Sequence, residues 1–157
     1  MIYTDLYGED LIIKPGTTVK TRRGAFAICV YNDHVLLSWS HFAPDLAEFP
    51  GGGIEEGETV EQALIREVRE EATVALPALK PVSIHAQMVQ YYANKAQEFW
   101  DYDQQFWVVK TDGWAPYFFG EDRVPEDAHR ARWVPLSEFK TLKMHAMHER
   151  ARAAIGL

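Results

Sequence analysis

The 157-residue sequence predicts one α/β domain over residues 1–157, with a mixed sheet and its helices arranged in at most three layers. Short runs of apolar residues typical of strands occur along the chain, and two stretches with helical character lie between them. Hydrophobic residues make up 47% of the chain and charged residues 25%, which excludes a disordered chain or a long coiled coil. No repeat, low-complexity tract or linker divides the sequence.

The first expected elements are a hairpin and a loop. Residues 24–31 and 35–39 predict two strands joined at Asn32 and Asp33, because Asn and Asp tolerate the positive φ of a tight turn. Residues 40–53 contain two prolines and end in three consecutive glycines, so they predict a loop.

A helix is expected from Val60 to Ala72, where Thr59 and Gln62 have the spacing of a capping box. The second half of the sequence predicts further strands and a closing helix. These later elements are strands at 82–91 and 104–110 with a turn at Asp112-Gly113, a short strand at Arg130–Pro135, and a helix over Leu142–Ile155.

Charge and cysteine content exclude several classes of protein. The 23 acidic against 16 basic residues give a net charge of −7, which argues against stable binding along nucleic-acid phosphates. The single Cys29 excludes an internal disulfide and a zinc site built on several thiolates. No apolar run reaches the ~18 residues needed to span a bilayer, and the start carries acids where a signal peptide carries lysines. We therefore expect a soluble cytoplasmic protein with no membrane contact, and a homodimer remains open.

Acidic residues are concentrated in residues 55–71, which contain seven glutamates and two arginines. Such a run is usually a solvated helix face. Helical geometry, however, places Glu67, Glu70 and Glu71 within roughly 100° of arc, beside the apolar stripe. Two carboxylates ~6 Å apart repel by roughly 3 kcal/mol at an effective dielectric of 20, so this crowding favours a bound cation. Hard oxygen ligands suit Mg²⁺ or Mn²⁺, and the preceding glycines allow the backbone to approach a metal or a phosphate.

The spacing of the glycines, arginine and glutamates resembles the signature of the Nudix hydrolase family. One defined position differs, because Thr73 stands where the family has glycine, and we expect the helix to end differently and to run toward Pro77. The resemblance implies a Nudix-like α/β/α sandwich with a mixed β-sheet. The matching residues, in order, are Gly52, Glu58, Arg66, Glu67, Val68, Glu70, Glu71, Ala72 and Val74.

The resemblance also implies roles for individual residues. Glu70 and Glu71 would bind Mg²⁺ or Mn²⁺ with help from the Gly51 carbonyl, and Glu67 would be a metal ligand or the general base. Arg66 and Glu58 would hold and orient the carboxylates. These implied site residues all lie in or just before the expected helix: Gly51, Glu58, Arg66, Glu67, Glu70 and Glu71.

Family members often recruit a further acid from a later loop. Glu126 and Asp127 are the candidates here, followed by Glu121 and Asp122, and a solvated loop is the alternative for each.

The implied reaction is Mg²⁺-dependent hydrolysis of a pyrophosphate bond in a nucleoside diphosphate linked to another group. The small size favours a nucleoside triphosphate, whereas a nucleotide sugar or a dinucleoside polyphosphate remains open. Two alternatives differ in kind: a non-catalytic module of this fold that senses a nucleotide, and an acidic structural helix without a metal.

Three further groups of residues allow both a functional and an ordinary structural interpretation. Arg22 and Arg23 are candidates to meet a substrate phosphate, although solvated surface is favoured. The aromatic side chains of residues 91–119 are candidates to stack on a base, although core packing is favoured. His145 and His148 are candidates to bind a metal, although the exposed surface of the closing helix is favoured because nothing nearby completes a site.

Overall fold

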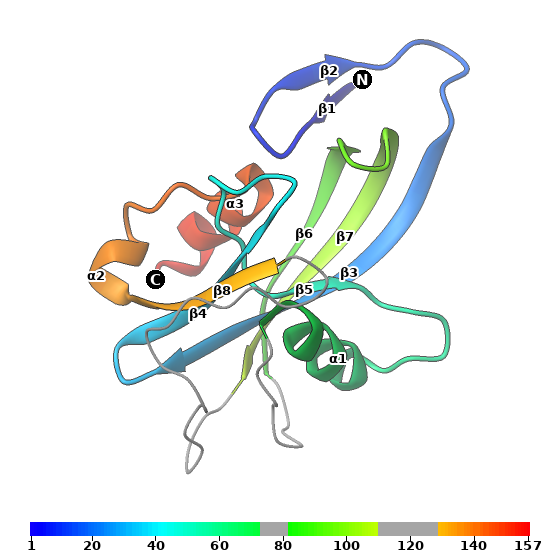
Figure 1. The fold of residues 1–157 in the computed structure, drawn as a ribbon. Helices are drawn as coiled ribbons and strands as arrows, with labels where there is room; N and C mark the ends of the chain where they lie inside the picture. The colour runs from blue at the N-terminus through cyan, green and yellow to red at the C-terminus, as the bar shows by residue number, and fades with distance from the viewer. Residues whose placement is uncertain (73–81, 110–128) are drawn as a thin grey trace.

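The computed structural model of the protein describes residues 1–72, 82–109 and 129–157, and its elements form a mixed sheet between two layers of helices (Figure 1). The strand order across the sheet is β2-β1-β6-β7-β3-β4-β8, and β5 pairs with β3 beside this path. The strands are β1 (Ile2–Thr4), β2 (Asp10–Ile12), β3 (Val19–Tyr31), β4 (His34–Ser40), β5 (Gly51–Gly53), β6 (Val82–Ala93), β7 (Glu98–Val109) and β8 (His129–Pro135). The helices are α1 (Val60–Ala72), α2 (Leu136–Phe139) and α3 (Ala146–Ile155).

Alternation along β3 divides the core between the two faces of the sheet. Ala25, Ala27 and Cys29 pack in one cluster with Leu64 and Val68 of α1. Phe26 and Ile28 point the other way, into a larger cluster that contains Phe139 of α2 and Met147 of α3. The small side chains on the first face let α1 approach the sheet closely. The expected α/β/α sandwich is thus confirmed.

The pairing of β3 creates the position that the site occupies. Residues Val19–Cys29 pair in parallel with β7, whereas β4 pairs with β3 only at Val30 and Tyr31, next to the turn. The edge of β3 therefore diverges from β4, and β5 fills part of the opening by pairing Gly51–Gly53 with Gly24–Phe26. This pairing holds the glycine run beside α1.

The hairpin and the first helix agree with the sequence prediction. Asn32 and Asp33 adopt φ values of 48° and 58° in the turn between β3 and β4. Helix α1 spans Val60–Ala72, as expected. Its capping box is formed in both directions: the Thr59 amide donates to the Gln62 side chain at 2.9 Å, and the Gln62 amide donates to the Thr59 hydroxyl at 3.1 Å.

Other expectations need correction. The expected loop at 40–53 contains a strand, β5, because the open edge of β3 offers its glycines backbone partners. The closing helix begins at Ala146 rather than at 142, because the His145 side chain accepts a hydrogen bond from the Met147 amide and caps it there. The strands β1 and β2 were not expected. The turn at 112–113 and the region after Ala72, which includes Thr73, lie outside the described residues.

Within the described ranges, none of the helices combines the length and the apolar character that crossing a bilayer requires.

Candidate active site

The guanidinium of Arg66 organises the acidic face of α1. Its Nε and one terminal nitrogen donate to the two oxygens of Glu58 at 2.8 and 2.9 Å, a bidentate pair. The same terminal nitrogen donates to the Gly53 carbonyl at 3.0 Å, and the other donates to Glu67 at 2.8 Å. These contacts lower the pKa of Glu58 and raise that of Arg66. Arg66 therefore ties the loop before α1, the strand β5 and the helix into one unit.

Glu71 is the most buried carboxylate of the cluster, with 8% of its surface exposed. The Gly51 amide donates to its Oε2 at 2.9 Å, which joins the last turn of α1 to β5. Burial raises the pKa of Glu71 well above the ordinary range, and the charges of Glu48, Glu67 and Glu70 raise it further. The hydrogen bond from Gly51 opposes this rise without cancelling it.

Glu48 belongs to the cluster, although sequence analysis did not identify it. Its amide and carbonyl exchange hydrogen bonds of 2.9 Å with Ser38 of β4, and this bridge fixes the backbone three residues before the glycine run. Burial raises the pKa of Glu48 to about 7, and the charge of Glu67 contributes. The signal available in the sequence was a lone acid in an apolar stretch just before Pro50.

At two positions of β5 the backbone lies so close to its neighbours that only glycine fits. A Cβ on Gly51 would collide with the Ala25 carbonyl and lie 2.6 Å from the Phe26 Cα, both on β3. A Cβ on Gly52 would lie 2.8 Å from an oxygen of the Glu67 carboxylate. The glycine run therefore lets the strand and the carboxylate occupy the same narrow space.

Glu67 and Glu70 differ in their surroundings. Burial raises the pKa of Glu67 despite its ion pair with Arg66. The Glu70 side chain is 47% exposed and lies 3.4 Å from the Arg66 guanidinium. Over the part of the chain that the structure describes, no group of three His, Cys, Asp or Glu side chains is arranged to hold a metal ion. Arg66 lies between carboxylates that would otherwise repel one another.

A polar cavity of about 640 Å³ borders this cluster. Glu67 of α1, Gly53 of β5, and Arg22 and Arg23 of β3 are among the residues that line it. The Arg22 guanidinium lies 4.8 Å from the centre of the Trp100 ring, and Arg23 lies 3.8 Å from Asp103. The lining of the cavity thus combines the two arginines with the carboxylates of Glu55, Glu56 and Glu67.

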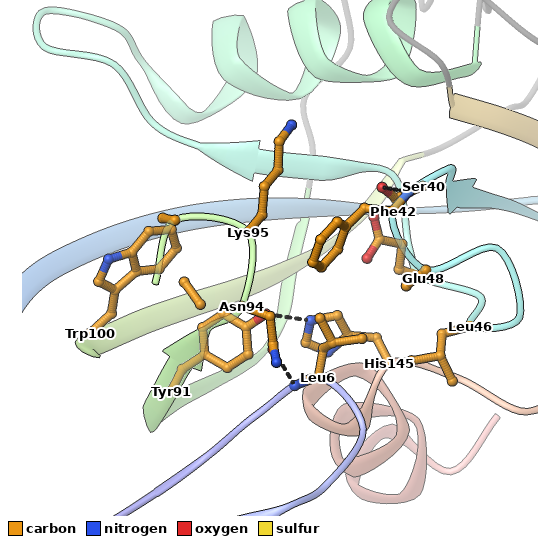
Figure 2. Close-up of a pocket in the computed structure, with 13 residues that line it drawn as sticks. Leu6, Ser40, Phe42, Leu46, Glu48, Tyr91, Asn94, Lys95, Trp100 and His145 are labelled. Atoms are coloured by element: carbon orange, nitrogen blue, oxygen red, sulfur yellow. Dashed lines mark hydrogen bonds between the residues drawn. The ribbon is translucent and has the colours of Figure 1, made fainter. Parts of the chain in front are cut away.

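A second cavity, of about 450 Å³, has Glu48 in its lining and is mainly apolar (Figure 2). Phe42, Tyr91 and Trp100 contribute aromatic rings to its lining, and His145 lies beside Tyr91. The Tyr91 and Trp100 rings are 5.9 Å apart. Glu48 lines this cavity as well, so the aromatic cavity adjoins the carboxylate cluster.

The structure places the other predicted residues as follows. Arg23 borders the same cavity as Glu67, whereas Glu126, Asp127, Glu121 and Asp122 lie outside the described residues. The expectation for His148 is wrong: it is 2% exposed and stacks on Phe49 in the core, where its Nδ1 accepts a hydrogen bond from the Phe49 amide. His145 is half-buried rather than on an exposed helix face: it lines the aromatic cavity and contacts Tyr91.

The model of the NUDIX domain family matches residues 20–155. The chain is 35% identical over 75 residues to an RNA pyrophosphohydrolase of Vibrio atlanticus (strain LGP32), covering 47% of this chain and 44% of that one. It is 35% identical over 97 residues to an 8-oxo-dGTP diphosphatase of Escherichia coli (strain K12), covering 62% and 63%. The match thus spans less than half of the first relative and less than two thirds of the second.

Solved structures share the fold. A MutT NUDIX hydrolase from Burkholderia pseudomallei superposes with a TM-score of 0.59 at 27% identity, covering 84% of this chain and 95% of that one. A bifunctional NMN adenylyltransferase/ADP ribose pyrophosphatase from Francisella tularensis, complexed with AMP and a Mn ion, gives a TM-score of 0.63 at 24% identity, covering 90% and 42%.

Proposed function

The chain belongs to the Nudix family, and from that premise we propose that it hydrolyses a pyrophosphate bond in a nucleoside diphosphate linked to another group, using Mg²⁺ or Mn²⁺. The observation that carries this proposal is the cluster of Glu48, Glu67, Glu70 and Glu71, whose negative charges lie together beside a cavity lined by two arginines.

The chemistry of the donors fits a divalent cation. Glu71 is buried and three neighbouring carboxylates raise its pKa, so its ionised form requires a positive charge beyond that of Arg66. Glu70 and Glu71, with the Gly51 carbonyl, would hold the cation, since Mg²⁺ and Mn²⁺ prefer carboxylate and carbonyl oxygens. When bound, the cation neutralises the diphosphate and lowers the pKa of a water molecule.

Glu67 is the proposed general base. Arg66 holds one of its oxygens at 2.8 Å and so fixes the direction of the carboxylate. Burial raises its pKa toward the working pH, which makes it a better proton acceptor than an exposed glutamate. Glu58 acts through Arg66, since its bidentate pair sets the plane of the guanidinium.

Arg22 and Arg23 are proposed to bind the phosphates that remain on the nucleotide. Both border the cavity that Glu67 lines, so a diphosphate between them would present its phosphorus atoms to the base. The aromatic cavity beyond Glu48 then takes the group attached to the phosphates. A volume of about 450 Å³ suits one planar base and sugar, so we propose a nucleoside triphosphate as the substrate.

The test is the release of phosphate or pyrophosphate from a panel of nucleoside triphosphates, nucleotide sugars and dinucleoside polyphosphates with Mg²⁺. Glu67→Gln removes the base without changing the size of the side chain, so kcat should fall by about 10²–10⁴-fold. Glu61→Gln is the matched control, because it removes a carboxylate from the first turn of the same helix. It should keep kcat within about twofold.

Two results would contradict the proposal. Undiminished hydrolysis by Glu67→Gln would exclude Glu67 as the base. No turnover of any panel member, with a nucleotide still bound, would favour the sensing module. Metal binding has its own readout: millimolar Mg²⁺ should raise the Tm of the wild type, and a similar rise in Glu70→Gln would exclude Glu70 as a ligand.

A further inference from the structure

The hydrogen bonds of His145 fix its tautomer. Its Nδ1 accepts a hydrogen bond from the Met147 amide at the start of α3, so Nδ1 carries no proton. Burial lowers the pKa of His145 to about 4, which keeps the ring neutral near pH 7. A neutral imidazole carries one proton, and here that proton must be on Nε2.

The tautomer in turn fixes the hydroxyl of Tyr91. The His145 Nε2 lies 3.1 Å from this oxygen, and because Nε2 carries the proton, it is the donor and Tyr91 the acceptor. The hydroxyl proton of Tyr91 is therefore directed elsewhere. Among the described residues, the Tyr91 hydroxyl makes no other hydrogen bond. Accepting a bond from His145 also polarises the hydroxyl and makes it a stronger donor.

Two polar neighbours of Tyr91 are already engaged, and the charge of Glu48, which lines the same cavity, also acts on Tyr91. Asn94 donates to Asp5 at 3.1 Å and accepts from the Leu6 amide at 3.4 Å, which holds the amino-terminal segment against the β6–β7 hairpin. The indole nitrogen of Trp100 donates to Glu98 at 2.8 Å. In Figure 2 the Lys95 side chain extends away from Tyr91. The hydroxyl of Tyr91 thus adds a directed donor to a cavity whose walls are aromatic.

We propose that Tyr91, held by the positioning residue His145, selects substrates whose planar ring carries a carbonyl oxygen, by donating a hydrogen bond to that oxygen. The inference rests on the proposed function, since it assigns the ring of the nucleotide to the aromatic cavity. An amino group in place of the carbonyl is itself a donor and meets an oxygen that already accepts from His145, so it is disfavoured.

The probes are inosine and adenosine nucleotides, which differ at one ring position by a carbonyl oxygen against an amino group, together with the neighbouring ring proton. The wild type should bind inosine monophosphate more tightly than adenosine monophosphate in calorimetry, and its KM for inosine triphosphate should be the lower. Tyr91→Phe keeps the ring and removes the donor, so the preference should fall by about fivefold, in KM and Kd rather than in kcat.

Two further variants separate recognition from packing. Tyr92→Phe removes the same atom from the neighbouring residue of β6, which does not line the cavity, and should leave the preference unchanged. His145→Ala frees the Tyr91 hydroxyl to rotate, so the preference should fall while the ring of Tyr91 stays in place. A variant that only destabilises the fold would lower the Tm of both nucleotide complexes equally. It would leave the ratio of the two nucleotide affinities unchanged.

The outcomes are distinct from those of the hydrolysis test. If the wild type hydrolyses its substrate and Tyr91→Phe keeps the inosine preference, the assignment of Tyr91 is overturned. The proposed function then still stands. A wild-type preference for adenosine would also overturn the assignment of Tyr91. The absence of turnover, with the inosine preference in binding lost in Tyr91→Phe, would support the recognition role and contradict the proposed hydrolysis.

Discussion

The carboxylate cluster and the aromatic cavity meet at Glu48 but are built on opposite electrostatic principles. In the cluster, carboxylates raise one another's pKa values, and Arg66 pairs with two of them, Glu67 and Glu70, as well as with the neighbouring Glu58. In the cavity, His145 is neutral and the Asn94 and Trp100 side chains already have partners. The ionised carboxylates of the cluster call for more positive charge than Arg66 supplies. In the aromatic cavity, by contrast, the protein's own hydrogen bonds already position the polar side chains named above.

This difference indicates where each region is sensitive. Charge changes act strongly in the cluster, because its groups interact with one another at short range in a partly buried site. In the cavity the Asn94, Trp100 and His145 side chains each have a hydrogen-bond partner of their own, so a substitution there removes one hydrogen bond and its effect stays local. Three predictions, in descending order of effect, test the comparison.

The largest effect is expected for Arg66→Ala. It leaves Glu58 and Glu67 without their cation, and breaking a partly buried pair of this kind costs about 3 kcal/mol. For a domain of this size the Tm should fall by about 10 °C in calorimetry. Lys143→Ala, which removes an exposed ion pair with Asp45, should lower it by about 2 °C or less. Equal losses would show that Arg66 has no special structural role.

The second effect concerns the glycines of β5. Gly52→Ala places a Cβ 2.8 Å from the Glu67 carboxylate, which must move, so kcat should fall by about tenfold with a small change in Tm. Gly53→Ala is the matched control. Its Cβ would lie 3.6 Å from Arg22, an ordinary contact, so kcat should stay within about twofold. Similar kcat values for the two variants would mean that the position of Glu67 does not limit the reaction.

The smallest effect is a dependence of stability on pH in metal-free protein. The pKa of Glu48 is about 7 in the folded state, above its ordinary 4.5, so the folded state holds the proton more tightly. Its contribution is therefore present below pH 4.5 and is lost as the pH rises through about 7. Between pH 5 and pH 8 the Tm should fall, by about 3 °C more in the wild type than in Glu48→Gln.

Glu138→Gln is the control for this titration. Arg132 lowers the pKa of Glu138 below its ordinary value, away from the range between pH 5 and pH 8, so its removal should change the slope there little. A slope that Glu48→Gln does not reduce would exclude Glu48 as its source. Saturating Mg²⁺ should flatten the slope of the wild type, since a bound cation favours the ionised carboxylates.

The cluster could be predicted from the sequence because most of it lies within one helix and the turn before it. Helical periodicity relates Glu67, Glu70 and Glu71 without any knowledge of the rest of the fold. Glu48 was not predicted because its position in the cluster depends on a backbone bridge to Ser38, which is a contact between two separate segments.

The aromatic cavity could not be predicted because its walls come from distant parts of the chain. Leu6, Glu48, Tyr91 and His145 meet only after the sheet and α3 have assembled. His145 is an example: its sequence neighbours predict a position on a helix surface, whereas its side chain caps the start of α3 and contacts Tyr91 of β6. The expected closing helix was placed too early for the same reason, since the cap at residue 145 is a side-chain contact.

The parallel pairing of β3 with β7 also has a consequence for the order of assembly. Val19 pairs with Phe99 and Cys29 with Val109, so the central pair of strands joins segments about 80 residues apart. A ribosome delivers the glycine run and the whole of α1 long before β7 emerges. Until then β3, on which α1 packs, lacks its neighbouring strand β7, so the sheet beneath the acidic helix is incomplete. Such long-range pairing is slow. The half of the protein that carries the carboxylate cluster is therefore synthesised first, and its support in the sheet is completed only after the other half arrives.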